Sequence, residues 1–87
     1  MKKTIEMLKN ENYYIELYDL IEDKLEEVRK ANGWKKMTED RYEEAMEKVA
    51  EDLGADVEDL KAYYEDQHER GRKPSFFAHF ALKNRAI

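Results

Sequence analysis

A long amphipathic pattern over residues 12–31 is the feature that most constrains how this chain folds. Its apolar side chains recur at alternating intervals of four and three residues, the spacing of one face of an α-helix: Tyr14, Tyr18, Ile21, Leu25 and Val28. Asn32-Gly33 follows as a left-handed helix end. The pattern predicts a helix that is buried on one side and charged on the other.

Local start and stop signals predict three further helices. Thr38 and Asp56 are good N-caps, Gly54 can end the helix between them, and Ser75 can cap a last short helix. Residues 1–11 are either a frayed extension of the first helix or a short separate turn. We therefore expect one all-α domain over residues 1–87, a compact bundle whose four helices cover residues 12–31, 38–53, 57–69 and 75–85.

Composition excludes several classes of function. The 87 residues include no cysteine, so disulfides and thiolate metal sites are excluded. No segment approaches the ~20 apolar residues of a membrane span, and no apolar run of signal-peptide length follows the two N-terminal lysines. Glu65-x-x-His68 is half of a di-iron helix signature, without the second pair that such a site needs. We expect a cytoplasmic protein that is not an enzyme and binds no metal or cofactor.

Residues 46–66 resemble a helix-turn-helix. The motif places a small residue four positions before a glycine, as Ala50 and Gly54 do, and the turn falls at residues 54–56. The resemblance implies a DNA-reading face on the second helix, which falls here on Asp56, Val57, Glu58, Lys61, Ala62 and Glu65. Three carboxylates and one lysine on this face would weaken binding to phosphates. The residues therefore favour a compact helical corner over a reader of the major groove.

Acidic side chains form rows along the predicted helices. At i,i+4 spacing eight pairs carry like charge and five carry opposite charge, although like pairs destabilise a helix slightly. One interpretation is a surface for a partner with a basic groove, in which spaced carboxylates take the place of phosphates. The other is an acidic surface that only keeps the protein in solution. The acidic residues proposed for partner binding are Glu39, Glu43, Glu47, Glu51, Glu58 and Glu65.

The last 18 residues have the opposite charge. Residues 1–69 carry 21 acidic and 11 basic side chains, a balance of −10, whereas residues 70–87 carry five basic side chains and no acidic one. These five could contact nucleic-acid phosphates or an acidic patch on a protein: Arg70, Arg72, Lys73, Lys83 and Arg85. Phe77 and Phe80 are expected in the core, with contact to a second copy or a partner through Phe76 and Leu82 as the alternative.

Adjacent tyrosines on a helix point in different directions, so one of each pair is expected to be exposed. We expect Tyr14 and Tyr63 in the core, which leaves Tyr13 and Tyr64 as interface aromatics together with Phe76. Trp34 either joins this interface or is partly buried against its own loop.

These features predict a small acidic protein-binding regulator or inhibitor, in the manner of the nucleic-acid mimics that phages and mobile elements use against basic proteins. Two alternatives remain. One is a helix-turn-helix-like DNA-binding transcriptional regulator that contacts phosphates through its basic C-terminal segment. The other is a structural homodimerisation domain.

Overall fold

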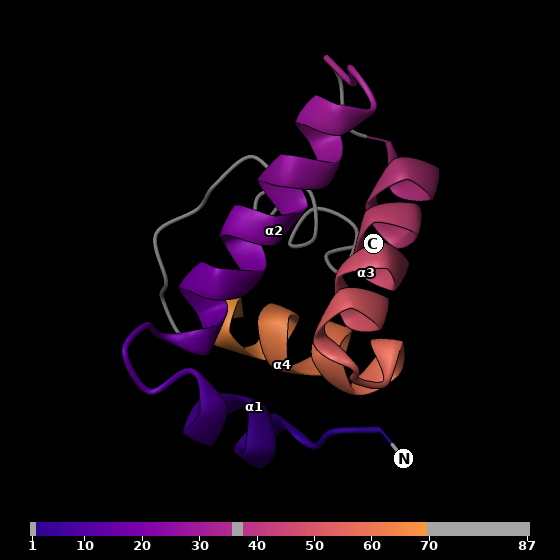
Figure 1. Ribbon diagram of the computed structural model, residues 1–87. Helices are drawn as coiled ribbons and strands as arrows, with labels where there is room; N and C mark the ends of the chain where they lie inside the picture. Colours follow the sequence, from indigo (N-terminus) through magenta and orange to yellow (C-terminus); the bar gives the residue numbers. More distant parts are fainter. Residues whose placement is uncertain (1, 36–37, 70–87) are drawn as a thin grey trace.

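The computed structural model describes residues 2–35 and 38–69, which fold into four α-helices with no strand beyond an isolated bridge. α2 and α3 pack alongside each other, α4 crosses their ends, and α1 packs against α4 (Figure 1). The predicted all-α bundle is confirmed for these residues, and the predicted helix over 75–85 lies outside them. The helices are α1 (Ile5–Glu11), α2 (Leu17–Ala31), α3 (Glu39–Leu53) and α4 (Val57–Glu69).

The N-terminal part differs from the prediction, because a separate helix precedes α2. The hydroxyl of Thr4 caps α1 by accepting a hydrogen bond from the backbone amide of Met7 (3.2 Å). Asn12 ends α1, since its backbone and side-chain amides both donate to the carbonyl oxygen of Leu8. A side chain bonded to the backbone in this way competes with continuation of the helix. The predicted helix over 12–31 was therefore wrong at its start, and α2 begins at Leu17.

Side chains from all four helices build one core. Its rings include Tyr18 of α2 and Tyr64 of α4, which stack with their centroids 5.0 Å apart. The backbone amide of Lys3 donates to the carbonyl oxygen of Gly54 (2.7 Å), which fastens the segment before α1 to the end of α3. The largest fully buried side chains are Tyr42, Tyr64, Leu8, Ile21, Leu25, Met46, Leu60 and Val49.

The corner between α3 and α4 has the geometry that its sequence predicts. Gly54 adopts a left-handed conformation (φ 74°), which is costly for residues with a Cβ atom. The amide of Ala55 donates to the carbonyl oxygen of Ala50 (2.9 Å), satisfying the end of α3. The carboxylate of Asp56 accepts from the amide of Asp59 (3.2 Å) and caps the start of α4. The corner turns the chain steeply, so that α4 runs across α2 and α3 (Figure 1).

Two of the tyrosine assignments were wrong. Tyr14 was expected in the core and is 74% exposed, because it lies in the turn before α2 and not on the helix whose spacing it matched. Tyr64 was expected at the surface and is fully buried, because α4 turns Leu60 and Tyr64 inward together. Tyr63 is half-buried at the edge of the core, and Tyr13 is 87% exposed.

Candidate partner-binding surface

The six glutamates singled out from the sequence lie on α3 and α4, four of them at the surface and two bonded between the two helices. The apolar face of α3 packs against the core and includes Tyr42, Met46 and Val49. The opposite face of the helix therefore carries charged side chains. Glu39, Glu47, Glu51 and Glu58 are exposed, whereas Glu43 and Glu65 are half-buried. We call the four exposed residues the acidic face.

Lys61 of α4 binds Glu43, one of the two half-buried glutamates. Its ammonium group donates to both carboxylate oxygens of Glu43 on α3, at 2.7 and 2.6 Å. Burial alone lowers the pKa of Lys61, but the hydrogen bond and charge of Glu43, together with the charges of Glu58 and Glu65, outweigh it and raise the pKa above its ordinary value. Glu43 therefore serves first to join α3 to α4.

Glu65 also has a partner within the fold. Its carboxylate accepts a hydrogen bond from the hydroxyl of Tyr42 (2.9 Å), a buried ring on α3. A buried hydroxyl needs such an acceptor, since leaving it without one costs free energy. Two of the six predicted partner-binding residues thus contribute to the internal structure of the α3–α4 corner.

The acidic face is held less closely by the fold, where Glu58 acts on Lys61 through its charge alone. Within the part of the chain that the structure describes, Glu39, Glu47, Glu51 and Glu58 form no ion pair. Glu47 and Glu51 stand at the edge of a hollow of about 530 Å³, which Ala50, Ala55 and Val57 line with apolar surface and to which Lys2 of the same chain also contributes. Carboxylates beside an apolar hollow suit the long side chains of lysine and arginine, which combine an aliphatic stem with a charged end.

Charges between α2 and α3, and within the last turns of α2, are neutralised locally. Lys24 of α2 donates to Asp52 of α3 (2.5 Å), and this hydrogen bond raises the pKa of Lys24. Arg29 donates to Glu26 from two of its nitrogens and thereby lowers the pKa of the Glu26 carboxyl. Among the described residues, exposed carboxylates without an ion pair remain on the outer side of α3, at the start of α4, and on α2 at Asp19, Asp23 and Glu27.

The predicted interface aromatics do not form one surface. Tyr64 is unavailable because it is buried, and Phe76 lies outside the described residues. Trp34 is half-buried near the end of α2; its carbonyl oxygen accepts from Arg29 (2.8 Å) and the guanidinium of Arg41 lies 5.7 Å from its ring centroid. Of the members of this set that the structure describes, Tyr13 alone is exposed, at 87%.

Sequence reasoning missed the exposed partner of Tyr13 and the bond between Glu43 and Lys61. The ring of Tyr14 packs edge-on against that of Tyr13, 6.1 Å between centroids, and both stand at the surface. The polar run before them, Asn10-Glu11-Asn12, is the signal that could have placed a turn here. No local signal could have found the Glu43–Lys61 bond, because 18 residues separate its ends.

The exposed positions of α4 argue against reading of DNA by this helix. Glu58, Asp59 and Ala62 are exposed, and the one lysine of the face, Lys61, is held by Glu43. The basic residues proposed for phosphate contact all lie outside the described residues: Arg70, Arg72, Lys73, Lys83 and Arg85.

Fold and surface together define a small all-α protein with a helix-turn-helix-like corner and an acidic outer face. The chain matches no known protein family, and neither a curated protein nor a solved structure matches it. Among the described helices, none is long and apolar enough to cross a membrane. In the same residues no group of three or more histidine, aspartate or glutamate side chains is placed to hold a metal ion.

Replacement of Lys61 by methionine tests the bond between α3 and α4. We expect the free energy of unfolding to fall by about 0.5–1.5 kcal/mol at pH 7, the range of a net hydrogen bond, because Lys61 is only 17% exposed while Glu43 remains 44% exposed. Urea denaturation measures the change. Lys48→Met, at an exposed position of α3, should cost less than about 0.5 kcal/mol.

The pH dependence of this difference follows from the raised pKa of Lys61. A lysine whose pKa is higher in the folded state contributes stability fully below its unfolded value of about 10.4, and the contribution is lost as pH rises through the folded value. The gap between the native chain and Lys61→Met should therefore be constant from pH 7 to 9 and shrink above about pH 10.5. A gap that widens at high pH would contradict this assignment.

Proposed function

We propose that this protein is a protein-binding regulator or inhibitor that places its acidic face in a basic groove of a partner protein. The observation that carries this proposal is that Glu39, Glu47, Glu51 and Glu58 are exposed and form no ion pair with the described part of the chain. A surface selected for folding alone gains by pairing such charges, since like charges one turn apart repel.

The arrangement of these charges supports a partner that normally binds nucleic acid. Glu39, Glu47 and Glu51 follow one side of α3, and successive turns of a helix rise by about 5.4 Å. The row presents negative charge along one side of the helix at intervals of two turns and then one turn, in the manner of phosphates along a backbone. Complementary charge raises the association rate and the specificity of such a complex more than it raises the affinity. A cytoplasmic location fits this role and the absence of cysteine.

The test compares two triple variants that remove the same charge from different faces. Glu39→Gln, Glu47→Gln and Glu51→Gln change α3, while Asp19→Asn, Asp23→Asn and Glu27→Gln change three exposed carboxylates of α2. The probe is the basic protein recovered by pull-down from the native host, and calorimetry measures its affinity for each chain. We expect the α3 triple to lower affinity at least about tenfold, at roughly 0.5–1 kcal/mol per charge, and the α2 triple to lower it less than about threefold.

The salt dependence of the affinity and a gel shift with DNA could each contradict the proposal. Affinity should fall as ionic strength rises, because exposed charges are screened over about 8–10 Å at physiological salt. Equal effects of the two triples, or an affinity that does not respond to salt, would refute the proposal. A gel shift of random duplex DNA at micromolar protein would instead favour the DNA-binding regulator, and a doubled mass in solution without a partner would favour the homodimer.

A further inference from the structure

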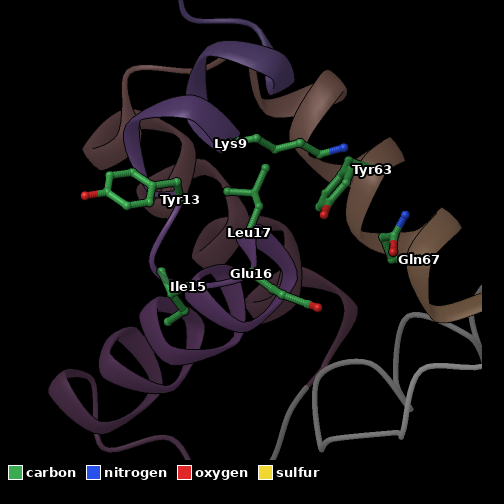
Figure 2. A pocket seen from close by; sticks show the side chains of 7 residues that line it. All are labelled: Lys9, Tyr13, Ile15, Glu16, Leu17, Tyr63 and Gln67. Atoms are coloured by element: carbon green, nitrogen blue, oxygen red, sulfur yellow. The ribbon is translucent and has the colours of Figure 1, made fainter.

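Two adjoining hollows mark the side of the molecule where α1, the turn after it and α4 meet. The first, of about 370 Å³, has apolar walls from Ile15, Leu17 and Tyr63, with Glu16 on its rim (Figure 2). The second lies between Ile5 and Ala62, again beside Tyr63, and carboxylates border it. Because Tyr63 lines both, they form one surface, which we call the α1–α4 groove. It uses none of the four residues of the acidic face.

Carboxylates border this groove, and polar and apolar side chains line it in similar measure. Asp59, Glu65 and Asp66 border the second hollow, and Glu16 borders the first. Among the described residues, Lys9 is the one cation lining either hollow, and its ammonium group lies 5.4 Å from the centroid of the Tyr63 ring. The groove is therefore complementary to a segment that combines apolar rings with positive charge.

Residues 70–87 have this combination and begin beside the groove. Gln67, which lines the first hollow, stands two residues before the end of α4 at Glu69 (Figure 2). The following 18 residues carry five basic side chains, no acidic one, and phenylalanines at 76, 77 and 80. Phe76 is nine residues beyond Gln67, a span of at most about 30 Å for an extended chain, so its ring can reach every part of the groove.

We propose that residues 70–87 dock in the α1–α4 groove of their own chain. A phenylalanine ring of the segment occupies the hollow between Ile15, Leu17 and Tyr63, and its basic side chains lie over the carboxylates of Asp59 and Asp66. The segment is already tethered at the edge of its site, so the cost of bringing it there is the closure of a short loop rather than the association of two molecules. The same contact would keep the phenylalanine rings from other proteins.

The isoleucines of the chain allow a direct test in the full-length protein. There are four, of which Ile15 and Ile5 line the two hollows, Ile21 is fully buried in the core and Ile87 ends the chain. Nuclear Overhauser effects are measured between phenylalanine ring protons and isoleucine methyl groups in a deuterated background. We expect cross-peaks to Ile15 and Ile5. Cross-peaks to Ile21 but neither groove residue, or none to any of these three, would overturn the proposal.

A mixed sample and a pair of matched variants complete the test. In a mixture of chains labelled only at phenylalanine with chains labelled only at isoleucine, cross-peaks to Ile15 should be absent; their presence would assign the groove to a second copy and overturn docking within one chain. Asp59→Asn with Asp66→Asn should weaken the Ile15 and Ile5 cross-peaks at least about twofold, whereas Asp19→Asn with Asp23→Asn should leave them unchanged. Equal effects of the two pairs would overturn the ionic part of the contact.

Discussion

Replacement of Tyr64 by alanine is expected to lower the free energy of unfolding by about 3–5 kcal/mol, the range of large aromatic truncations in a core. The ring of Tyr64 is fully buried and stacks on Tyr18 with an interplanar angle of 13°. Its hydroxyl donates to the carboxylate of Glu22 on α2 (2.8 Å). Since domains of this size are stable by about 5–15 kcal/mol, the variant should lose a large part of its folded population on mild heating.

The measurement is urea denaturation followed by circular dichroism, with two comparison variants. Tyr14→Ala removes the same side chain from a position that is 74% exposed, and should change stability by less than about 0.5 kcal/mol. Tyr64→Phe keeps the ring and removes only the bond to Glu22, for which about 0.5–1.5 kcal/mol is expected. Similar losses for Tyr64→Ala and Tyr14→Ala would contradict the assignment of Tyr64 to the core.

Replacement of Ala50 by leucine should lower the free energy of unfolding by about 1–3 kcal/mol, because it adds three carbon atoms to a side chain that is buried on α3. Ala50 is buried on α3 one turn before Gly54, and its carbonyl oxygen accepts from the amide of Ala55. α3 packs against α4, and Ala50 lines one hollow together with Val57 at the start of α4. A larger side chain must push the two helices apart or displace its neighbours from their preferred rotamers.

Ala31→Leu is the matched control, because it makes the same change at an exposed residue in the last turn of α2. It should alter stability by less than about 0.5 kcal/mol. Both variants are compared by urea denaturation, and the heteronuclear NMR spectrum of Ala50→Leu should shift most for residues of α3 and α4. A loss equal to that of Ala31→Leu would mean that the corner does not depend on a small residue at position 50.

The second half of the fold was predictable because its signals are local. Thr38 and Asp56 each cap a helix start by accepting from a backbone amide three residues later, and Gly54 ends α3 in the left-handed conformation. These signals act over four or five residues and depend little on what packs around them. The predicted helices 38–53 and 57–69 therefore agree with α3 and α4 to within a residue.

The first half was not predictable in the same way. Tyr14 matches the spacing of the apolar residues of α2, so periodicity alone predicts that the helix includes Tyr14. The hydrogen bonds from Asn12 to Leu8 instead end α1 and place Tyr14 in a turn. The choice between adjacent tyrosines likewise depends on which ring another helix covers. Tyr64 is inside because Tyr18 stacks on it, and the spacing within α4 does not decide the choice, since Tyr63 and Tyr64 both lie about one turn after Leu60.

The acidic character of the surface was determined by the sequence alone, since charged side chains opposite an apolar helix face remain in water in any such fold. The tertiary structure decided how those charges divide. It brought Lys61 to Glu43 and Tyr42 to Glu65, across 18 and 23 residues of chain, and left Glu39, Glu47, Glu51 and Glu58 exposed. Such pairs form only when α4 crosses α3, because two residues so far apart along the chain meet through packing and not through helical spacing.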